Sequence, residues 1–370
     1  MTNWKTYQGQ TPWDLTPVAS KIIYNEGDKL ATIADSVWHP PGQGNDPITP
    51  EHAPCGYWSK DYVIPSSDPG LPCDWEEVAP QYGDDTVNRP SSLIVYNDEI
   101  YASSYGLGYT LLKWNGINAW IGIIAYASTN ATRSLATLGN YLYGLGANCN
   151  LNKWDGESSW TRIVTNTTYY SPTILISYNG KLYTYEGSPS SVQLLEWDGV
   201  TSWVSKGAYA VADAETVADM IVYNDDLYLN TVAGLLVWNG TDTLTKIADY
   251  ISGDGGAGHC VVYNNSLYMT KGKYLYLLDG SQFVLQSGEM SDSENSLDII
   301  DYEGKLLICG SSTGGCTLWL YEESSFTEAA LTDVNTVNTL CLYNGRLFSS
   351  GDKVDNTNTG ILWRWTKVYS

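Results

Sequence analysis

Carboxylates are the residues of this chain best suited to do chemistry, and six of them lie in or just before apolar strand patterns. They are Asp84, Asp85, Glu215, Asp219, Asp298 and Asp333. A glycoside hydrolase or a polysaccharide lyase needs two carboxyl groups that flank the bond it cleaves. No pair stands out among the 41 acidic residues of the chain. Solvated strand ends and a bound structural cation are therefore the alternatives to catalysis.

Metal-binding residue types gather in one segment, Ser36 to Trp75, which contains His39, His52, Cys55 and Cys73. Zinc binds such side chains, but their spacing matches no common zinc motif. We therefore expect no metal site and no cofactor, with a structural cation as the one exception left open. The third histidine, His259, begins an apolar strand pattern and is interpreted as structural. The chain has no P-loop, no GxSxG and no HExxH motif, so we predict no catalytic residues.

Aromatic side chains are a second kind of candidate, because an exposed ring can stack on a sugar. Six of them lie in the connections between strand patterns, and we predict these as ligand-binding residues: Trp38, Trp58, Tyr105, Tyr109, Tyr169 and Tyr170. The alternative is that each ring packs its own connection against the neighbouring strands.

A repeated element must position all of these residues. The hexapeptide YNGKLY, Tyr178 to Tyr183, returns in seven close or looser copies. Counted from the residue before the turn, the eight copies start at positions 24, 96, 138, 178, 223, 263, 302 and 343. The first interval is 72 residues and the others are 39 to 45. An interval of about 40–45 residues is typical of a four-stranded propeller blade.

One such unit predicts four strands, which we call A to D. Strand A is Thr173–Tyr178, strand B is Lys181–Glu186, strand C is Gln193–Trp197, and strand D starts near Trp203. Asn179-Gly180, between A and B, is a strong signal for a type I′ hairpin turn. A second tight turn of the WDG type separates strands C and D.

Strand D begins with a bulky apolar residue in seven units, at Trp75, Trp120, Trp160, Trp203, Leu244, Phe283 and Phe326, and Trp4 near the N-terminus matches the same pattern. We therefore predict an all-β fold, an eight-bladed β-propeller of four-stranded antiparallel blades, closed by the N-terminal strand joining the last blade. Residues 1–370 then form a single propeller, and residues 36–75 form a long proline-rich insertion in the B–C loop of the first blade. The alternative is seven blades plus an N-terminal appendage.

The YNGxLY…WDG…W pattern resembles the degenerate propeller repeats of bacterial surface proteins and of structural proteins of tailed viruses, over nearly the whole chain. It lacks the GH…WD pair of WD40 repeats and the Gly-Gly doublet of kelch repeats. The resemblance implies the fold, and it favours a place in a virion, as a phage tail or capsid-surface protein.

The composition of the chain excludes some classes of partner. The formal net charge is −22, which repels phosphate backbones and anionic lipids, so we expect no nucleic acid partner. No apolar run is long enough to cross a bilayer and no signal peptide is visible, so we expect a soluble protein without membrane insertion.

Of the seven cysteines, Cys260 and Cys341 fit strand cores. Disulfides between Cys55 and Cys73 or between Cys309 and Cys316 stay open.

The function expected from these patterns is a non-catalytic binding or assembly module, a virion structural or host-recognition protein of a tailed virus. Its partners would be other structural proteins of the assembly, with a host-surface glycan as a further ligand left open. One alternative is a polysaccharide-active hydrolase or lyase that uses axial carboxylates. The other is an intracellular protein-interaction scaffold. The predicted location is the virion, with an extracellular or cytoplasmic location as the alternative. Binding is expected on the face with the B–C and D–A connections, because variable loops on a rigid scaffold usually carry function.

Overall fold

The computed structural model consists of two compact units, Met1–Pro72 and Cys73–Ser370. It describes part of the chain, namely residues 4–5, 22–25, 31–32, 37–39, 57–59, 75–79, 89–105, 108–126, 132–146, 149–157, 159–165, 172–188, 191–210, 217–232, 234–240, 243–250, 257–286, 290, 295–312, 315–322, 325–331, 334–353 and 361–365. Among these residues, no helix is long and apolar enough to cross a membrane.

The first unit contributes two small sheets to the described residues. One has the order β1 (Trp4–Lys5), β2 (Ile22–Asn25) and β3 (Ala31–Thr32), and the other pairs β4 (Val37–His39) with β5 (Tyr57–Ser59). Strand β1 lies antiparallel to β2, with Trp4 opposite Asn25. Most of the segment 36–75 lies outside the described residues.

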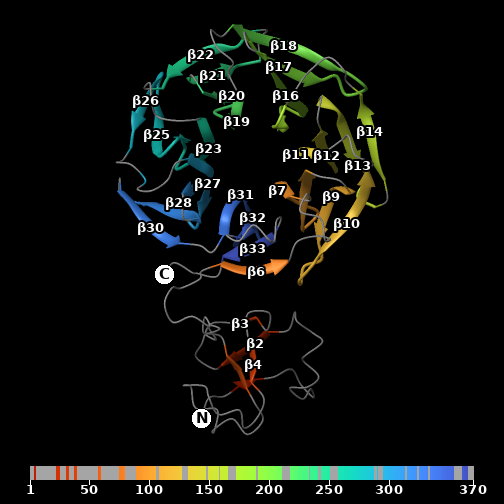
Figure 1. Ribbon diagram of the computed structural model, residues 1–370, viewed down its shortest axis with the longest axis vertical. Helices are drawn as coiled ribbons and strands as arrows, with labels where there is room; N and C mark the ends of the chain where they lie inside the picture. The colour runs from red at the N-terminus through yellow and green to blue at the C-terminus, as the bar shows by residue number, and fades with distance from the viewer. Residues whose placement is uncertain are drawn as a thin grey trace. The chain divides into compact units, whose positions relative to one another are not determined.

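The second unit is a propeller of seven four-stranded antiparallel sheets arranged around one axis (Figure 1). Blade 1 is β7 (Arg89–Tyr96), β8 (Glu99–Tyr105), β9 (Gly108–Trp114) and β10 (Trp120–Tyr126). Blade 2 is β11 (Thr132–Leu138), β12 (Tyr141–Gly146), β13 (Leu151–Trp154) and β14 (Trp160–Val164). Blade 3 is β15 (Ile176–Tyr178), β16 (Lys181–Ser188), β17 (Ser191–Trp197) and β18 (Trp203–Ala210).

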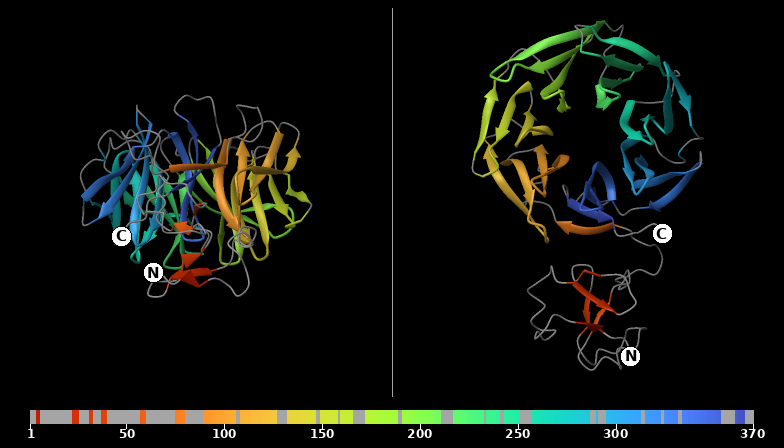
Figure 2. Two further views of the ribbon diagram at one scale, coloured as in Figure 1. Left: turned by 90° about the horizontal axis from the view of Figure 1, so that it is seen from below. Right: turned by 180° about the vertical axis from the view of Figure 1, so that it is seen from behind.

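The remaining blades follow in chain order (Figure 2). Blade 4 is β19 (Val217–Tyr223), β20 (Asp226–Thr231), β21 (Gly234–Trp238) and β22 (Thr245–Asp249). Blade 5 is β23 (Ala257–Tyr263), β24 (Ser266–Lys271), β25 (Tyr274–Asp279) and β26 (Gln282–Leu285). Blade 6 is β27 (Asn295–Tyr302), β28 (Lys305–Ser312), β29 (Gly315–Glu322) and β30 (Ser325–Leu331). Blade 7 is β31 (Val334–Tyr343), β32 (Arg346–Lys353), β33 (Ile361–Trp365) and β6 (Trp75–Ala79).

Strand β6 closes the ring, and this corrects the prediction of eight blades. It supplies the outer strand of blade 7, with Trp75 opposite Trp365. The sequence pattern assigned Trp75 to the D strand of a first blade and gave the closing position to Trp4. Trp4 instead pairs with β2 in the first unit. The copy of the repeat at Tyr24 therefore builds no blade, and the long first interval of 72 residues marks the boundary between the units.

The repeated turn has the predicted conformation. Both of its central residues have positive φ in six blades, as at Asn179 and Gly180 in blade 3, with φ of 46° and 72°. This is the type I′ geometry that matches the twist of the flanking strands. Since strands A to D alternate in direction, the A–B and C–D turns lie together at one end of the ring, which we call the turn face.

The core lies between neighbouring blades. Seven clusters of buried residues occur, and each contains side chains from two consecutive blades, including one from blades 7 and 1. A single blade therefore cannot bury its apolar surface alone, and stability depends on completing the ring.

Candidate functional sites at the axis and where the ring closes

In five of the seven blades, the tyrosine that opens the repeat joins its blade to the next one. The hydroxyl of Tyr96 donates a hydrogen bond to the main-chain oxygen of Asn140, in the A–B turn of the following blade. The same bond occurs at four more junctions, from Tyr178 to Asp225, Tyr223 to Asn265, Tyr263 to Gly304 and Tyr343 to Asp98. Blade 2 has Leu138 at this position, and leucine has no hydroxyl to donate. The tyrosine is thus both a core residue and a link between blades.

A second set of links lies nearer the axis, at the fourth residue before this tyrosine or leucine. Around the ring these residues are Ser92, Ser134, Ile174, Asp219, His259, Asp298 and Thr339. The inner strands of six blades have a β-bulge beside this position. A bulge redirects the side chain next to it. As a result, oxygens of Ser134, Asp219 and Asp298 accept backbone N–H bonds from the next blade, from Leu175, Cys260 and Leu340 respectively.

Three of these axial residues are titratable and lie in consecutive blades. We call Asp219 of β19, His259 of β23 and Asp298 of β27 the axial cluster. Nδ1 of His259 is 3.7 Å from Oδ2 of Asp219 and 3.8 Å from Oδ1 of Asp298. These distances are too long for hydrogen bonds and short enough for attraction between charges.

Burial governs the electrostatics of the axial cluster. It raises the pKa of Asp219 and of Asp298, because both carboxylates lose hydration, while His259 and the backbone donors act in the opposite direction. Asp298 raises the pKa of Asp219 further by like-charge repulsion. Each carboxylate also accepts an N–H of its own strand, from Met220 and from Ile299.

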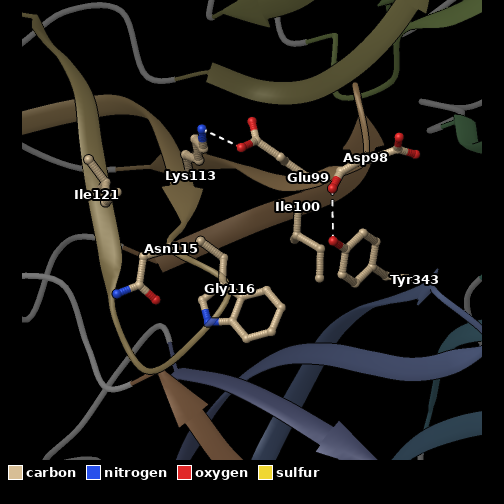
Figure 3. Close-up of a pocket in the computed structure, with 9 residues that line it drawn as sticks. Asp98, Glu99, Ile100, Lys113, Asn115, Gly116, Ile121 and Tyr343 are labelled. Atoms are coloured by element: carbon tan, nitrogen blue, oxygen red, sulfur yellow. Dashed lines mark hydrogen bonds and ion pairs between the residues drawn. The ribbon is translucent and has the colours of Figure 1, made fainter. Parts of the chain in front are cut away.

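A pocket of about 270 Å³ opens on the turn face, where blade 7 meets blade 1 (Figure 3). We call it the closure pocket, and its lining is Asp98, Glu99, Ile100, Lys113, Trp114, Asn115, Gly116, Ile121 and Tyr343. In Figure 3 the Lys113 ammonium group points to Glu99, and the Tyr343 hydroxyl points to the Asp98 carbonyl. Lys113 and Glu99 form an ion pair of 2.6 Å. The side chain of Asp98 is exposed and pairs with no described cation.

One exposed aliphatic side chain lines this pocket, and a second belongs to a turn that lines it. Ile121 lines it and is 45% exposed, and Ile117, in the C–D turn that also supplies Asn115 and Gly116, is 75% exposed. The side chain of Asn115 fixes that turn by accepting the backbone N–H groups of Ile117, Asn118 and Ala119. Ile121 therefore lines the same pocket as Asp98 and Glu99, and Ile117 lies in the turn that forms part of its wall.

The predicted aromatic residues are not gathered into one described site. Trp38 and Trp58 lie opposite each other in the β4–β5 pair of the first unit. Tyr105 ends β8 and Tyr109 belongs to β9, on either side of the B–C connection of blade 1, and their side chains lie outside the described residues. Tyr169 and Tyr170 lie outside the described residues altogether. Their role in binding stays a prediction.

Of the predicted carboxylates, the structure brings Asp219 and Asp298 together through His259. Asp84, Asp85, Glu215 and Asp333 lie outside the described residues, as do His52, Cys55 and Cys73. Sequence reasoning treated His259 as structural and missed its partners. The signal was available, because all three residues lie four positions before the repeated tyrosine.

Five cysteines of the propeller lie among the described residues. Cys149, Cys260, Cys309, Cys316 and Cys341 are buried, and none of them is in a disulfide. The core positions predicted for Cys260 and Cys341 are confirmed. Cys309 lies opposite Leu318 and Cys316 opposite Ser311, so the two cysteines are diagonal neighbours, not a bonded pair. Among the described residues, no group of three or more His, Cys, Asp and Glu side chains could hold a metal ion.

The comparisons with known proteins concern the fold. The chain matches no known protein family and no curated protein. Among solved structures, it is similar to YCF48 bound to a D1 peptide, with a TM-score of 0.59 and 14% identity over 80% of this chain and 97% of that chain. The WD40 propeller domain of Doa1 has a TM-score of 0.57 and 15% identity, covering 78% and 95% of the two chains. A chain of a mitotic checkpoint complex has a TM-score of 0.58 and 12% identity, covering 83% and 96%. At these identities the similarity shows a β-propeller fold alone, and propellers host unrelated functions.

Proposed function

We propose that this protein is a non-catalytic propeller that binds a segment of a partner protein. The fold supports the proposal, because propellers often serve as protein-binding scaffolds. The similar structures include one named for a bound peptide and one named for a multi-protein complex. The two carboxylates that could serve a hydrolase, Asp219 and Asp298, already accept backbone hydrogen bonds, which favours a structural role for them.

The observation that carries the proposal is the closure pocket with its exposed isoleucines. Ile117 and Ile121 offer apolar surface, while Asp98 offers a carboxylate without a described ion-pair partner. The chain as a whole has a net charge of −22. Opposite charge speeds association and selects partners. The occupant is therefore an extended segment with a lysine or arginine next to an aliphatic or aromatic residue.

A random-peptide display library, selected on the purified full chain, tests this proposal. We expect the selected peptides to combine Lys or Arg with an apolar residue. Binding should weaken about tenfold when Ile117 and Ile121 are both changed to Ser, and again in Asp98→Asn, because central apolar contacts and charges carry most of the affinity.

Blades 3 and 4 provide matched controls. Val200 and Val204 occupy the positions of Ile117 and Ile121 in blade 3, with exposures of 67% and 44%. Asp225 occupies the position of Asp98 in blade 4, and its carbonyl also accepts a tyrosine hydroxyl. Val200→Ser with Val204→Ser, and separately Asp225→Asn, should leave binding unchanged. The proposal is wrong if selection yields no peptide, or if the two sets of variants weaken binding equally.

The more specific expectations from sequence stay predictions. They are a virion location, contacts with other structural proteins, and binding of a host glycan by Trp38, Trp58 and the predicted tyrosines. Binding at the closure pocket differs from the sequence expectation in one respect, because it places the site on the turn face instead of the face with the variable connections.

A further inference from the structure

His259 lies between two carboxylates that come from the blades on either side of its own. Its Nδ1 atom is at almost equal distances, 3.7 Å and 3.8 Å, from Asp219 of blade 4 and Asp298 of blade 6. The side chain of His259 is 37% exposed, whereas those of the two aspartates are 19% and 15% exposed. Protons from solvent can therefore reach the imidazole, while the carboxylates depend on their neighbours for stabilisation.

The other titratable groups near β23 do not compete for this position. The described strands that pack on β23 are β19, β20, β24 and β27. Their titratable residues are Asp219, Tyr223, Asp226, Tyr228, Tyr268, Lys271, Asp298, Asp301 and Tyr302, and β23 itself adds Cys260 and Tyr263. Among the described residues, only Asp219 and Asp298 form ion pairs with His259. Lys271 instead donates to the carbonyl of Val232.

We propose that His259 is a proton-operated clamp, which fastens blades 4, 5 and 6 at the axis when its imidazole is charged. This inference does not depend on the proposed binding function. The clamp extends the backbone links already described, since Asp219 accepts the N–H of Cys260 and Asp298 accepts the N–H of Leu340. One imidazolium thus stabilises both carboxylates that tie consecutive inner strands together.

The charge on the imidazole of His259 explains whether the folded state gains or loses stability as the pH changes. When His259 is neutral, the two carboxylates repel each other with no cation between them. A proton on the imidazole places a positive charge within 4 Å of both, which favours the folded state. The clamp requires that both aspartates are ionised and that the imidazole is charged. It is lost as the pH rises and the imidazole loses its proton.

Thermal unfolding of the full chain tests the clamp. Between about pH 8 and about pH 5.5, where a histidine changes charge, the Tm of the wild type should rise about 2–4 °C more than the Tm of His259→Gln. In a background of Asp219→Asn with Asp298→Asn, the change His259→Gln should no longer alter the pH dependence. The proposal is overturned if His259→Gln has the wild-type pH profile, or if its effect persists in the double-asparagine background.

A second measurement does not require any change in the axial cluster. A variant with His39→Gln and His52→Gln retains His259 as its single histidine. In its NMR spectra, the imidazole signal of His259 and the amide signals of Cys260 and Leu340 should shift with one common midpoint as the pH changes. Its Tm profile should also match that of the wild type. Amide signals that stay fixed while the imidazole titrates would contradict the clamp.

Discussion

The hydroxyl of Tyr343 donates a 2.8 Å hydrogen bond to the main-chain oxygen of Asp98, although the two residues are 245 positions apart in the sequence. The bond joins the last blade to the first on the turn face, beside the closure pocket. Strand β6 makes the other connection, by completing blade 7 directly before blade 1 begins. The ring is therefore closed at one junction by both a strand and a tyrosine.

Replacing the linking tyrosines by phenylalanine should destabilise the propeller in proportion to their burial. Tyr96→Phe removes a half-buried bond and should cost about 1 kcal/mol in the free energy of unfolding, whereas Tyr343→Phe removes an exposed one and should cost about 0.5 kcal/mol. Urea unfolding measures both values. The control is Tyr141→Phe, since the Tyr141 hydroxyl has no described hydrogen-bond partner. An equal loss in all three variants would show that the hydroxyl bonds do not link the blades.

Gly144 should tolerate no side chain, because Trp160 lies against its α-carbon. A β-carbon at this position would be 2.5 Å from Cη2 of Trp160 and 2.8 Å from Cγ2 of Thr132. Gly144→Ala should therefore destabilise the protein by about 1–3 kcal/mol through overpacking. Chemical denaturation of a double-mutant cycle with Trp160→Phe checks the cause. The penalty should shrink in the phenylalanine background, and an unchanged penalty would rule out this contact as its source.

The raised pKa values of Asp219 and Asp298 predict a pH dependence of stability that comes from the carboxyl groups themselves. A carboxyl group whose pKa is raised on folding stabilises the protein while it is protonated. That contribution is lost as the pH rises from the ordinary aspartate pKa through the raised one. In the double variant Asp219→Asn with Asp298→Asn, the free energy of unfolding should decrease less as the pH rises over this range. Each asparagine also loses one backbone bond, so the slope with pH is the quantity to compare. An unchanged slope would contradict burial as the cause.

The contribution of Glu196 to stability should change with pH in the direction opposite to that of Asp219 and Asp298. Burial raises its pKa, but hydrogen bonds from Lys181 and Tyr183 outweigh burial and lower the pKa overall. A lowered pKa means that stability is present above the ordinary glutamate pKa and is lost as the pH falls. Glu196→Gln should cost about 1 kcal/mol at neutral pH, since Lys181 is itself half exposed. Glu322→Gln is the control, because the Glu322 side chain is 48% exposed against 9% for Glu196, and its ion pair with Lys305 should be worth at most about 0.5 kcal/mol. Equal losses in the two variants would count against the role of burial.

Much of the blade could be predicted from sequence. In blade 3, strands C and D and the type I′ turn at Asn179-Gly180 were predicted closely, because apolar alternation and positive φ are local properties. The number of blades could not be predicted in this way. Tyr24 and Trp4 match the repeat locally, but which strand closes the ring depends on long-range pairing, and Trp75 pairs with Trp365 instead.

The candidate sites, too, were determined partly by local sequence patterns and partly by contacts between distant parts of the chain. The repeat itself determined where each tyrosine and each axial residue would lie within its blade, because their offsets from the turn are constant. Only the tertiary structure decided which of them meet. Consecutive blades bring Asp219, His259 and Asp298 within ion-pair distance, and closure brings Tyr343 to Asp98. The alternation of apolar and polar residues in the sequence determines which face of a strand is apolar. The contacts between blades depend instead on how many blades complete the ring.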